Sequence, residues 1–159
     1  MHLTLIEGTE DRLAECREVF LNSEIYARYF AEAGKLERIL RRAAQAGELY
    51  LAVTDADEVA GVIRLNRCGF CGLCPYLALL GAKEGFRGQG VGRFLMDQVD
   101  AKVRAWGYRR VALMVSDFNA PARAFYERIG YRTLGLIPDA AMPGIGEYLM
   151  LKDLPDGPC

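Results

Sequence analysis

Residues 76–107 read YLALLGAKEGFRGQGVGRFLMDQVDAKVRAWG. An apolar run opens this stretch, a turn with several glycines follows, and apolar residues then recur at helical spacing as far as Trp106. This order predicts a strand, a glycine-rich turn and a helix near the middle of the chain.

The glycine-rich turn is suited to binding an anion. Gly88, Gly90 and Gly92 have no β-carbon, so the backbone there can adopt positive φ and approach a ligand closely. The first N–H groups of the following helix have no partner inside the helix, and with the helix dipole they favour a phosphate. Arg87 and Arg93 add positive charge on either side of the turn.

The spacing of the glycines narrows the kind of phosphate ligand. A P-loop has Lys and then Ser or Thr directly after its last glycine, whereas Arg93 and Phe94 follow Gly92. A dinucleotide-binding turn has Gly-x-Gly-x-x-Gly in the first strand–turn–helix unit, which differs in both spacing and position. The pattern Arg-x-x-Gly-x-Gly, which ends at Gly92, instead resembles the pyrophosphate-binding turn of the Gcn5-related N-acetyltransferase (GNAT) superfamily, which binds acetyl-coenzyme A. A turn that only connects a strand to a helix remains the alternative.

The composition is that of an ordinary folded protein. Its 159 residues suit a single domain, 1–159, and a 52% share of apolar residues excludes a disordered chain. The net charge of −1, without any block of like charges, gives no sign of nucleic acid or an anionic membrane as a partner. No apolar run reaches the length of a transmembrane helix and residues 1–7 lack the features of a signal peptide, so a cytoplasmic location is expected.

Three of the five cysteines are closely spaced, as Cys68, Cys71 and Cys74. Such spacing allows metal ligands, but a fourth ligand has to come from a distant part of the sequence: Cys16, Cys159 or His2. The alternative, which we favour, is that these cysteines pack as small apolar residues. A cytoplasmic setting disfavours a disulfide, and no metal is expected.

Predicted strands and helices alternate along the chain. Strands are predicted at 2–7, 48–54, 58–66, 76–82, 109–115, 131–137 and 147–152. Helices are predicted at 9–20, 35–46, 91–106 and 120–129, an aromatic stripe of helical spacing at 22–33, and loops at 67–73 and 138–146. The almost wholly apolar segment 76–82 is typical of a strand buried on both faces. The order β-α-α-β-β-β-α-β-α-β-β indicates a mixed central sheet with helices on both faces.

Residues 116–131, SDFNAPARAFYERIGY, form a second motif. They resemble the GNAT pattern Asn-x-x-Ala-x-x-x-Tyr-x-x-x-Gly-Phe/Tyr, which is matched at Asn119, Ala122, Tyr126, Gly130 and Tyr131. The motif lies one strand downstream of the glycine turn, as in that family. The two motifs make residues 76–131 similar to a GNAT acetyltransferase, and the order of strands extends the resemblance to the whole chain.

The resemblance implies a fold and a cofactor. The fold is α/β (α+β), a GNAT-type mixed, splayed central sheet of about seven strands flanked by helices on both faces. The cofactor is acetyl-coenzyme A as co-substrate, with its pantetheine arm on the end of the 76–82 strand and its pyrophosphate on the glycine turn. The implied cofactor-binding residues are Leu80, Gly81, Ala82, Arg87, Gly88, Gln89, Gly90, Val91, Gly92, Arg93, Asn119 and Tyr126.

Acetyl transfer gives some of these residues a chemical role. When an amine attacks the thioester, negative charge develops on the carbonyl oxygen, and a backbone N–H near Gly81 or Ala82 would stabilise it. Coenzyme A leaves as a thiolate, so Tyr126, with an ordinary phenol pKa of about 10, is interpreted as the general acid that protonates it. The alternative for Tyr126 is an aromatic residue on the core face of its helix.

The general base is less well defined. The second motif resembles that of N-terminal protein acetyltransferases, in which a glutamate lies five residues before the asparagine; here that position is Met114. This departure puts the mechanism and substrate of that subfamily in doubt for this chain. Glu84, Asp117 and Glu147 are candidates by their proximity to the motifs, and Glu84 is the tentative base, although each also fits a solvated or structural carboxylate. His2 lies far from both motifs in sequence.

The acceptor-binding residues are expected in the first helices and the late loop. Tyr26, Tyr29 and Glu147 are the candidate substrate residues, with 138–146 as a further wall. The alternative for both tyrosines is a place in the core. No charge signature selects an acceptor, so a small-molecule amine and a peptide amine both remain open.

The predicted function is acetyl-coenzyme A-dependent N-acetylation of a primary amine, by direct transfer in a ternary complex. No cysteine fits a nucleophile motif, so no acetyl-enzyme is expected. A non-catalytic acyl-coenzyme A sensor or interaction module on the same fold is the main alternative, and a cysteine-cluster metal or redox protein is another. A homodimer is left open.

Overall fold

The computed structural model describes residues 1–155 and divides into two compact units. The first unit comprises Met1–Leu65 and Leu79–Val99, and the second comprises Asn66–Ala78 and the chain from Asp100 onward. Cys159, considered above as a metal ligand, lies outside the described residues. No helix within residues 1–155 is long and apolar enough to cross a membrane.

The strands form a mixed sheet in the order β1-β2-β3-β4-β5-β7-β6. Pairing is parallel between β4 and β5 and antiparallel between β1 and β2, β2 and β3, β5 and β7, and β6 and β7. A seven-stranded mixed sheet flanked by helices confirms the predicted fold class. The elements are β1 Leu3–Glu7, a 3₁₀ turn η1 Glu10–Arg12, α1 Leu13–Glu18, α2 Glu24–Tyr29, α3 Lys35–Gln45, β2 Leu49–Thr54, β3 Val59–Phe70, β4 Cys74–Ala82, a 3₁₀ turn η2 Glu84–Phe86, α4 Val91–Ala105, β5 Arg110–Ser116, α5 Ala120–Arg128, β6 Arg132–Met142 and β7 Ile145–Asp153.

In the first unit, α1 and α3 pack on one face of the sheet. The apolar residues of α3 recur at helical spacing, so one side of this helix is buried against β2 and β3. The core contains Leu13, Cys16, Val19, Phe20, Phe30, Leu36, Leu40, Ala43, Leu49, Leu51, Val53, Val59 and Val62.

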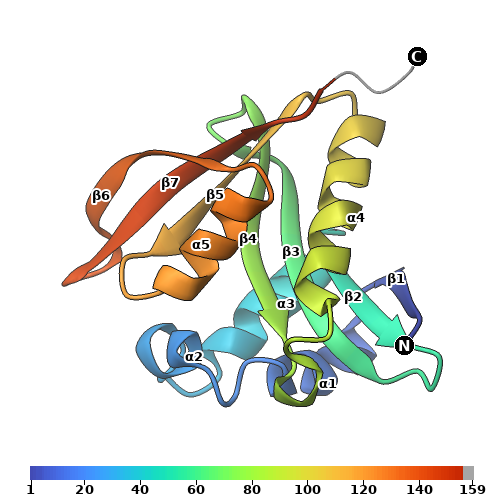
Figure 1. Ribbon diagram of the computed structural model, residues 1–159. Coiled ribbons are helices and arrows are strands. Elements are labelled where there is room, and N and C mark those ends of the chain that lie inside the picture. The colour runs from blue at the N-terminus through green and yellow to red at the C-terminus, as the bar shows by residue number, and fades with distance from the viewer. Residues whose placement is uncertain (156–159) are drawn as a thin grey trace. The chain divides into compact units, whose positions relative to one another are not determined.

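The start of α4 packs on the opposite face, where Gly61 leaves room for it. A β-carbon at Gly61 would come within 2.7 Å of Val91 Cγ1 and 2.9 Å of Leu95 Cδ1. Val62, the next residue of β3, belongs to the core on the other face, because successive strand residues point to opposite sides. Helices therefore cover both faces of this part of the sheet (Figure 1).

In the second unit, the long β6–β7 hairpin lies along β5, with α5 nearby (Figure 1). The register of β5 with β7 runs from Arg110↔Asp153 to Ser116↔Glu147. A small core of this unit has three buried residues and three partly buried aromatic residues: Cys74, Ala112, Leu151, Phe70, Tyr76 and Tyr108. Cys74 packs as an apolar residue, as expected, but Cys68 and Cys71, for which the same was expected, are exposed.

Two predictions about loops are wrong. The predicted 67–73 loop is much shorter, because β3 continues to Phe70 and β4 begins at Cys74. The predicted 138–146 loop is mostly strand, because β6 continues to Met142 and β7 starts at Ile145. Pro138 misled this assignment: β6 is at the edge of the sheet, where a strand residue without an N–H is tolerated.

Two further predictions need correction. The region between β1 and β2 contains three separate α-helices instead of two. Residues 76–82 are also not buried on both faces, because Ala78 is exposed and 79–82 are only half-buried. The apolar run in β4 therefore does not reflect a fully buried strand.

Gly81 is required by the packing of the first unit. A β-carbon at Gly81 would lie only 2.8 Å from Cζ and 3.0 Å from Cδ1 of Phe20, whose ring is buried in the core. We expect Gly81→Ala to lower the free energy of unfolding by about 1–3 kcal/mol, the usual effect of overpacking a core. Urea denaturation with tryptophan fluorescence as the readout measures this change.

Gly85→Ala is the matched control, because a β-carbon at Gly85 meets nothing within 4 Å. Combining Gly81→Ala with Phe20→Leu should cost less than the sum of the two single changes, since the smaller side chain frees the space. Equal stability of the Gly81→Ala and Gly85→Ala variants would show that the close contact has no energetic consequence.

Candidate functional site

The glycine turn between β4 and α4 has the conformation that its sequence predicts. Gly88 and Gly90 have φ of +73° and +86°, values that side-chain-bearing residues rarely adopt. A β-carbon at either position meets nothing within 4 Å, so the turn is open on its outer side. The helix then starts at Val91, and the N–H of Phe94 donates to the carbonyl of Gly90 at 2.9 Å.

Side chains of the turn brace its backbone. Arg87 Nε donates to the carbonyl oxygen of Ala82 at 3.2 Å, and Gln89 Nε2 donates to that of Gly85 at 2.8 Å. The N–H groups of the first helical turn have no partner within the helix. The arrangement is a preformed, electropositive turn that can bind an anion such as a phosphate.

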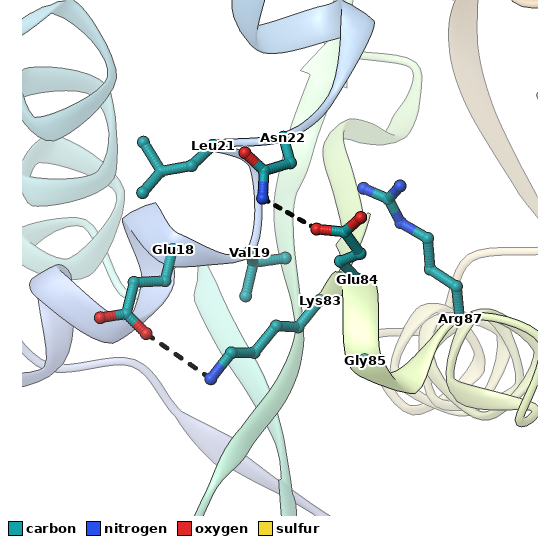
Figure 2. Close-up of a pocket in the computed structure, with 8 residues that line it drawn as sticks. All are labelled: Glu18, Val19, Leu21, Asn22, Lys83, Glu84, Gly85 and Arg87. Atoms are coloured by element: carbon teal, nitrogen blue, oxygen red, sulfur yellow. Dashed lines mark hydrogen bonds and ion pairs between the residues drawn. The ribbon is translucent and has the colours of Figure 1, made fainter.

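A pocket of about 360 Å³ lies beside this turn. Its lining comes from the end of α1 with the residues that follow it, and from the end of β4 with η2 (Figure 2): Glu18, Val19, Leu21, Asn22, Lys83, Glu84, Gly85 and Arg87. Lys83 Nζ pairs with Glu58 at 2.9 Å and with Glu18 at 3.5 Å. These contacts connect the end of α1 and the residue before β3 to the residue that follows β4.

Glu84, the predicted general base, is held in this pocket by Asn22. Asn22 Nδ2 donates to Glu84 Oε2 at 2.8 Å (Figure 2). The structure therefore places Glu84 in the first unit, with one carboxylate oxygen engaged in a hydrogen bond at the glycine turn.

Tyr126 and Asn119, from the second motif, belong to α5 in the second unit. Tyr126 is buried and packs edge-on against Tyr131, with ring centroids 5.7 Å apart. Burial, and to a lesser extent the neighbouring Tyr76, raises the pKa of Tyr126, so its phenol keeps its proton at neutral pH. Asn119 caps the helix, because its Oδ1 accepts from the N–H of Ala122 at 3.3 Å.

Glu147 is a buried carboxylate at the end of the β5–β7 register. It is only 7% exposed, and Ser116 Oγ donates to its Oε1 at 3.1 Å. The pKa of Tyr76 is raised, mainly by burial and secondly by the negative charge of Glu147. Tyr76 therefore lies within electrostatic reach of both Glu147 and Tyr126.

Asp117, the third candidate base, has a structural role. Its Oδ2 accepts from the N–H of Gly146 at 2.9 Å, and its own N–H donates to the carbonyl of Gly146 at 2.8 Å. These paired bonds connect the end of β5 to the start of β7.

The two predicted acceptor tyrosines lie in the first unit. Tyr26 and Tyr29 are partly buried against its hydrophobic core, where each ring lies about 6.5 Å from Phe30. This packing gives them a structural role beside any role in acceptor binding. His2 lies on the surface and faces Asp55 at 3.2 Å.

The cysteines are free thiols in the described chain. Cys16 and Cys74 are buried, and burial raises the pKa of Cys16 to about 12. Cys68 is exposed, with Sγ 3.1 Å from the hydroxyl oxygen of Tyr108. Within residues 1–155, no three metal-ligating side chains come together.

The structure groups the predicted site residues by unit. The first unit brings the glycine turn, Arg87 and Glu84 together; the second brings Tyr126 and Glu147 within reach of a common neighbour, Tyr76. Sequence reasoning missed Asn22, Tyr76 and Ser116. No sequence signal pairs Ser116 with Glu147, since they are 31 residues apart and meet only through the β5–β7 register.

Comparisons with known proteins agree with this picture. Residues 10–131 match the model of the acetyltransferase (GNAT) family. Blasticidin-S acetyltransferase of Streptomyces morookaense is 38% identical over 80 residues, which is 50% of this chain and 57% of that protein, so the chain spans little more than half the length of this relative.

Two solved structures show the same fold over nearly the whole chain. Ard1 from Thermoplasma volcanium superposes with a TM-score of 0.80 at 20% identity, covering 98% of this chain and 100% of that one. The PaiA N-acetyltransferase from Thermoplasma acidophilum, solved in complex with coenzyme A, gives a TM-score of 0.72 at 17% identity, covering 96% and 99%. With a family model that matches most of its length, and with both family motifs in the predicted elements, the chain belongs to the GNAT family of acetyltransferases.

Proposed function

We propose that this protein is an acetyl-coenzyme A-dependent N-acetyltransferase that acts on a primary amine. The observation that carries the proposal is the open glycine turn, with Gly88 and Gly90 in left-handed conformations at the start of α4. A single acetyltransferase domain, 1–159, is part of the proposal, since the family match at 10–131 includes residues of both units. A cytoplasmic location is also part of the proposal.

The cofactor would be held mainly by backbone groups. The N–H groups from Gly88 to Arg93 would bind the pyrophosphate, and the end of β4, at Leu80, Gly81 and Ala82, would pair with the pantetheine arm. The coenzyme A complex of the PaiA N-acetyltransferase supports coenzyme A as the ligand of this fold. No metal is required for this chemistry.

The transfer is proposed to be direct. The amine would attack the thioester carbonyl, and a backbone N–H at Gly81 or Ala82 would stabilise the negative charge on the oxygen. Tyr126 would then protonate the coenzyme A thiolate. The raised pKa of Tyr126 keeps its phenol protonated at neutral pH, so that it has a proton to donate.

The proposal defines the acceptor only by its chemical class, a primary amine. Relatives are named for the antibiotics blasticidin-S and nourseothricin, and structural neighbours include Naa20 bound to a bisubstrate analogue. We therefore keep both a small-molecule amine and a peptide amine, with Tyr26 and Tyr29 as candidate contacts. A homodimer remains open.

Binding of acetyl-coenzyme A is the first test of the proposal. At a ligand concentration 100 times the dissociation constant, the free energy of unfolding should rise by about 2.7 kcal/mol. Thermal unfolding with and without the ligand measures this, and thiol release with a panel of primary amines measures turnover. Binding without turnover of any amine would favour a non-catalytic acyl-coenzyme A sensor; no binding would refute the proposal.

Gly90→Val should weaken acetyl-coenzyme A binding at least tenfold. The side chain would extend from the open side of the turn, where the pyrophosphate is proposed to bind, and it would strain a left-handed backbone by about 1–2 kcal/mol. Isothermal titration calorimetry measures the affinity.

Gly107→Val separates the two causes. Gly107 also has a left-handed φ, of +84°, and an open outer side, but it follows the other end of α4. The Gly107→Val variant should lose comparable stability and keep its affinity for acetyl-coenzyme A. Wild-type affinity in Gly90→Val, or equal loss in both variants, would refute the assignment of the turn.

Tyr126→Phe should lower kcat by roughly 10²- to 10⁴-fold with little change in acetyl-coenzyme A affinity, because only the proton donor is removed. Tyr131→Phe is the matched control. Tyr131 is also buried, its hydroxyl has no hydrogen-bond partner among residues 1–155, and the family pattern accepts phenylalanine there. If the two variants turn over equally fast, Tyr126 is not the acid.

A further inference from the structure

We propose that Glu147 binds the protonated amine of the acceptor and removes its proton, so that the general base of this protein comes from β7 instead of β5. The inference rests on the proposed function and defines its substrate class as amines that are cationic at neutral pH. It also replaces Glu84 as the assignment of the base.

The first argument is the register of the sheet. Met114 stands where the similar N-terminal acetyltransferases have their glutamate, and it pairs with Leu149. Ser116 lies two residues further along β5 and pairs with Glu147. Since side chains of a strand alternate between faces, and directly paired residues share a face, Met114, Ser116 and Glu147 lie on the same face. A carboxylate thus lies two pairs further along the register, on the neighbouring strand.

The second argument is the row of residues on that face. Tyr76 pairs with Ala112, which in turn pairs with Leu151, and these three belong to the small core of the second unit. The face therefore has an apolar end at Ala112 and a polar end at Ser116 and Glu147. Tyr76 lies within electrostatic reach of both Glu147 and the proposed acid, Tyr126, so base and acid share a neighbour.

The third argument is the cost of burying Glu147. A carboxylate that is only 7% exposed loses most of its hydration, and hydrogen bonds such as that from Ser116 offset this loss. A cation beside such a carboxylate is attracted more strongly than in water, because the site is poorly hydrated. This environment favours an ammonium group over a neutral ligand.

The other candidate carboxylates fit the role less well. The Asp117 carboxylate accepts a hydrogen bond from the backbone N–H of Gly146. Glu84 lies in η2, at the pocket beside the glycine turn, and not on a strand of the sheet. Among the three candidates, Glu147 is the one that shares its sheet face with Met114.

The proton balance is complete with these residues. Glu147 takes one proton from the ammonium group and later releases it to solvent. The neutral amine forms a bond to the carbonyl carbon, the carbon–sulfur bond breaks, and Tyr126 gives its proton to the departing thiolate. The second proton from the nitrogen then restores Tyr126. The products are the amide, coenzyme A thiol and one proton.

Two amines of nearly the same size test the assignment: ethylamine, which is cationic at neutral pH, and 2,2,2-trifluoroethylamine, which is mostly neutral. We expect Glu147→Gln to lower kcat/KM for ethylamine about 100-fold, the usual effect of a lost general base, and to lower that for trifluoroethylamine much less. The affinity for acetyl-coenzyme A, from calorimetry, should stay within about twofold, since Glu147 does not bind the cofactor.

A second variant tests the position of the base directly. Met114 and its partner Leu149 are only half-buried, so a carboxylate is tolerated there. Adding Met114→Glu to Glu147→Gln should raise kcat/KM for ethylamine at least tenfold above that of the Glu147→Gln single variant, because it returns a carboxylate to the same face. Glu127→Gln, which changes an exposed carboxylate on α5, is the control for loss of charge.

Several outcomes overturn the assignment. Equal losses for both amines in Glu147→Gln would indicate a structural role, as would a lowered unfolding temperature with no rescue by Met114→Glu. A selective loss in Glu84→Gln instead would return the base to Glu84. If wild type does not acetylate ethylamine, the assignment of Glu147 to an ammonium group fails; retained acetyl-coenzyme A binding and acetylation of trifluoroethylamine would show that the proposed function still stands.

Discussion

The close packing of α4 on β3 at Gly61 is the contact on which the proposed cofactor site depends. Val91 and Leu95 are almost fully buried, and burial of such side chains contributes about 1.5–3 kcal/mol each. Val91 is also the first residue of α4, so the same contact fixes where the helix begins. A methyl group at Gly61 would displace the helix, and with it the N–H groups of the glycine turn. The same contact therefore positions the glycine turn and stabilises the first unit.

The second unit uses hydrogen-bonded strands in the same way. The antiparallel register of β5 with β7 brings Ser116 opposite Glu147, and the parallel pairing of β4 with β5 adds Tyr76 to the same face. Backbone hydrogen bonds place these side chains, so a slip of β7 by one residue would move Glu147 to the other face. Asp117 resists such a slip, because its side chain and backbone both bond to Gly146 at the start of β7.

The fold itself does not select an acceptor. Proteins of the same fold in the comparisons include a nourseothricin acetyltransferase and Naa20 bound to a bisubstrate analogue, which agrees with the general separation of fold from function. Under the proposal, the side chains around the reacting amine select the acceptor. At the site proposed for this chain, residue 114 is a methionine and a buried carboxylate, Glu147, lies on the adjacent strand. Chemistry at a site can persist when a carboxylate moves to a neighbouring strand, because only its position relative to the amine matters.

The sequence by itself determined the features that depend on local chemistry. The glycines at 88 and 90, the Asn119 cap and the apolar periodicity of α3 and α4 each act within one element, so the turn, the caps and the helices were predictable. The family followed from two such local motifs. Only the tertiary structure decided which distant residues meet: Gly61 with α4, Gly81 with Phe20, and Ser116 with Glu147. It also decided that Pro138 lies in an edge strand. These outcomes depend on strand register and on packing between elements, which residue spacing along the chain does not encode.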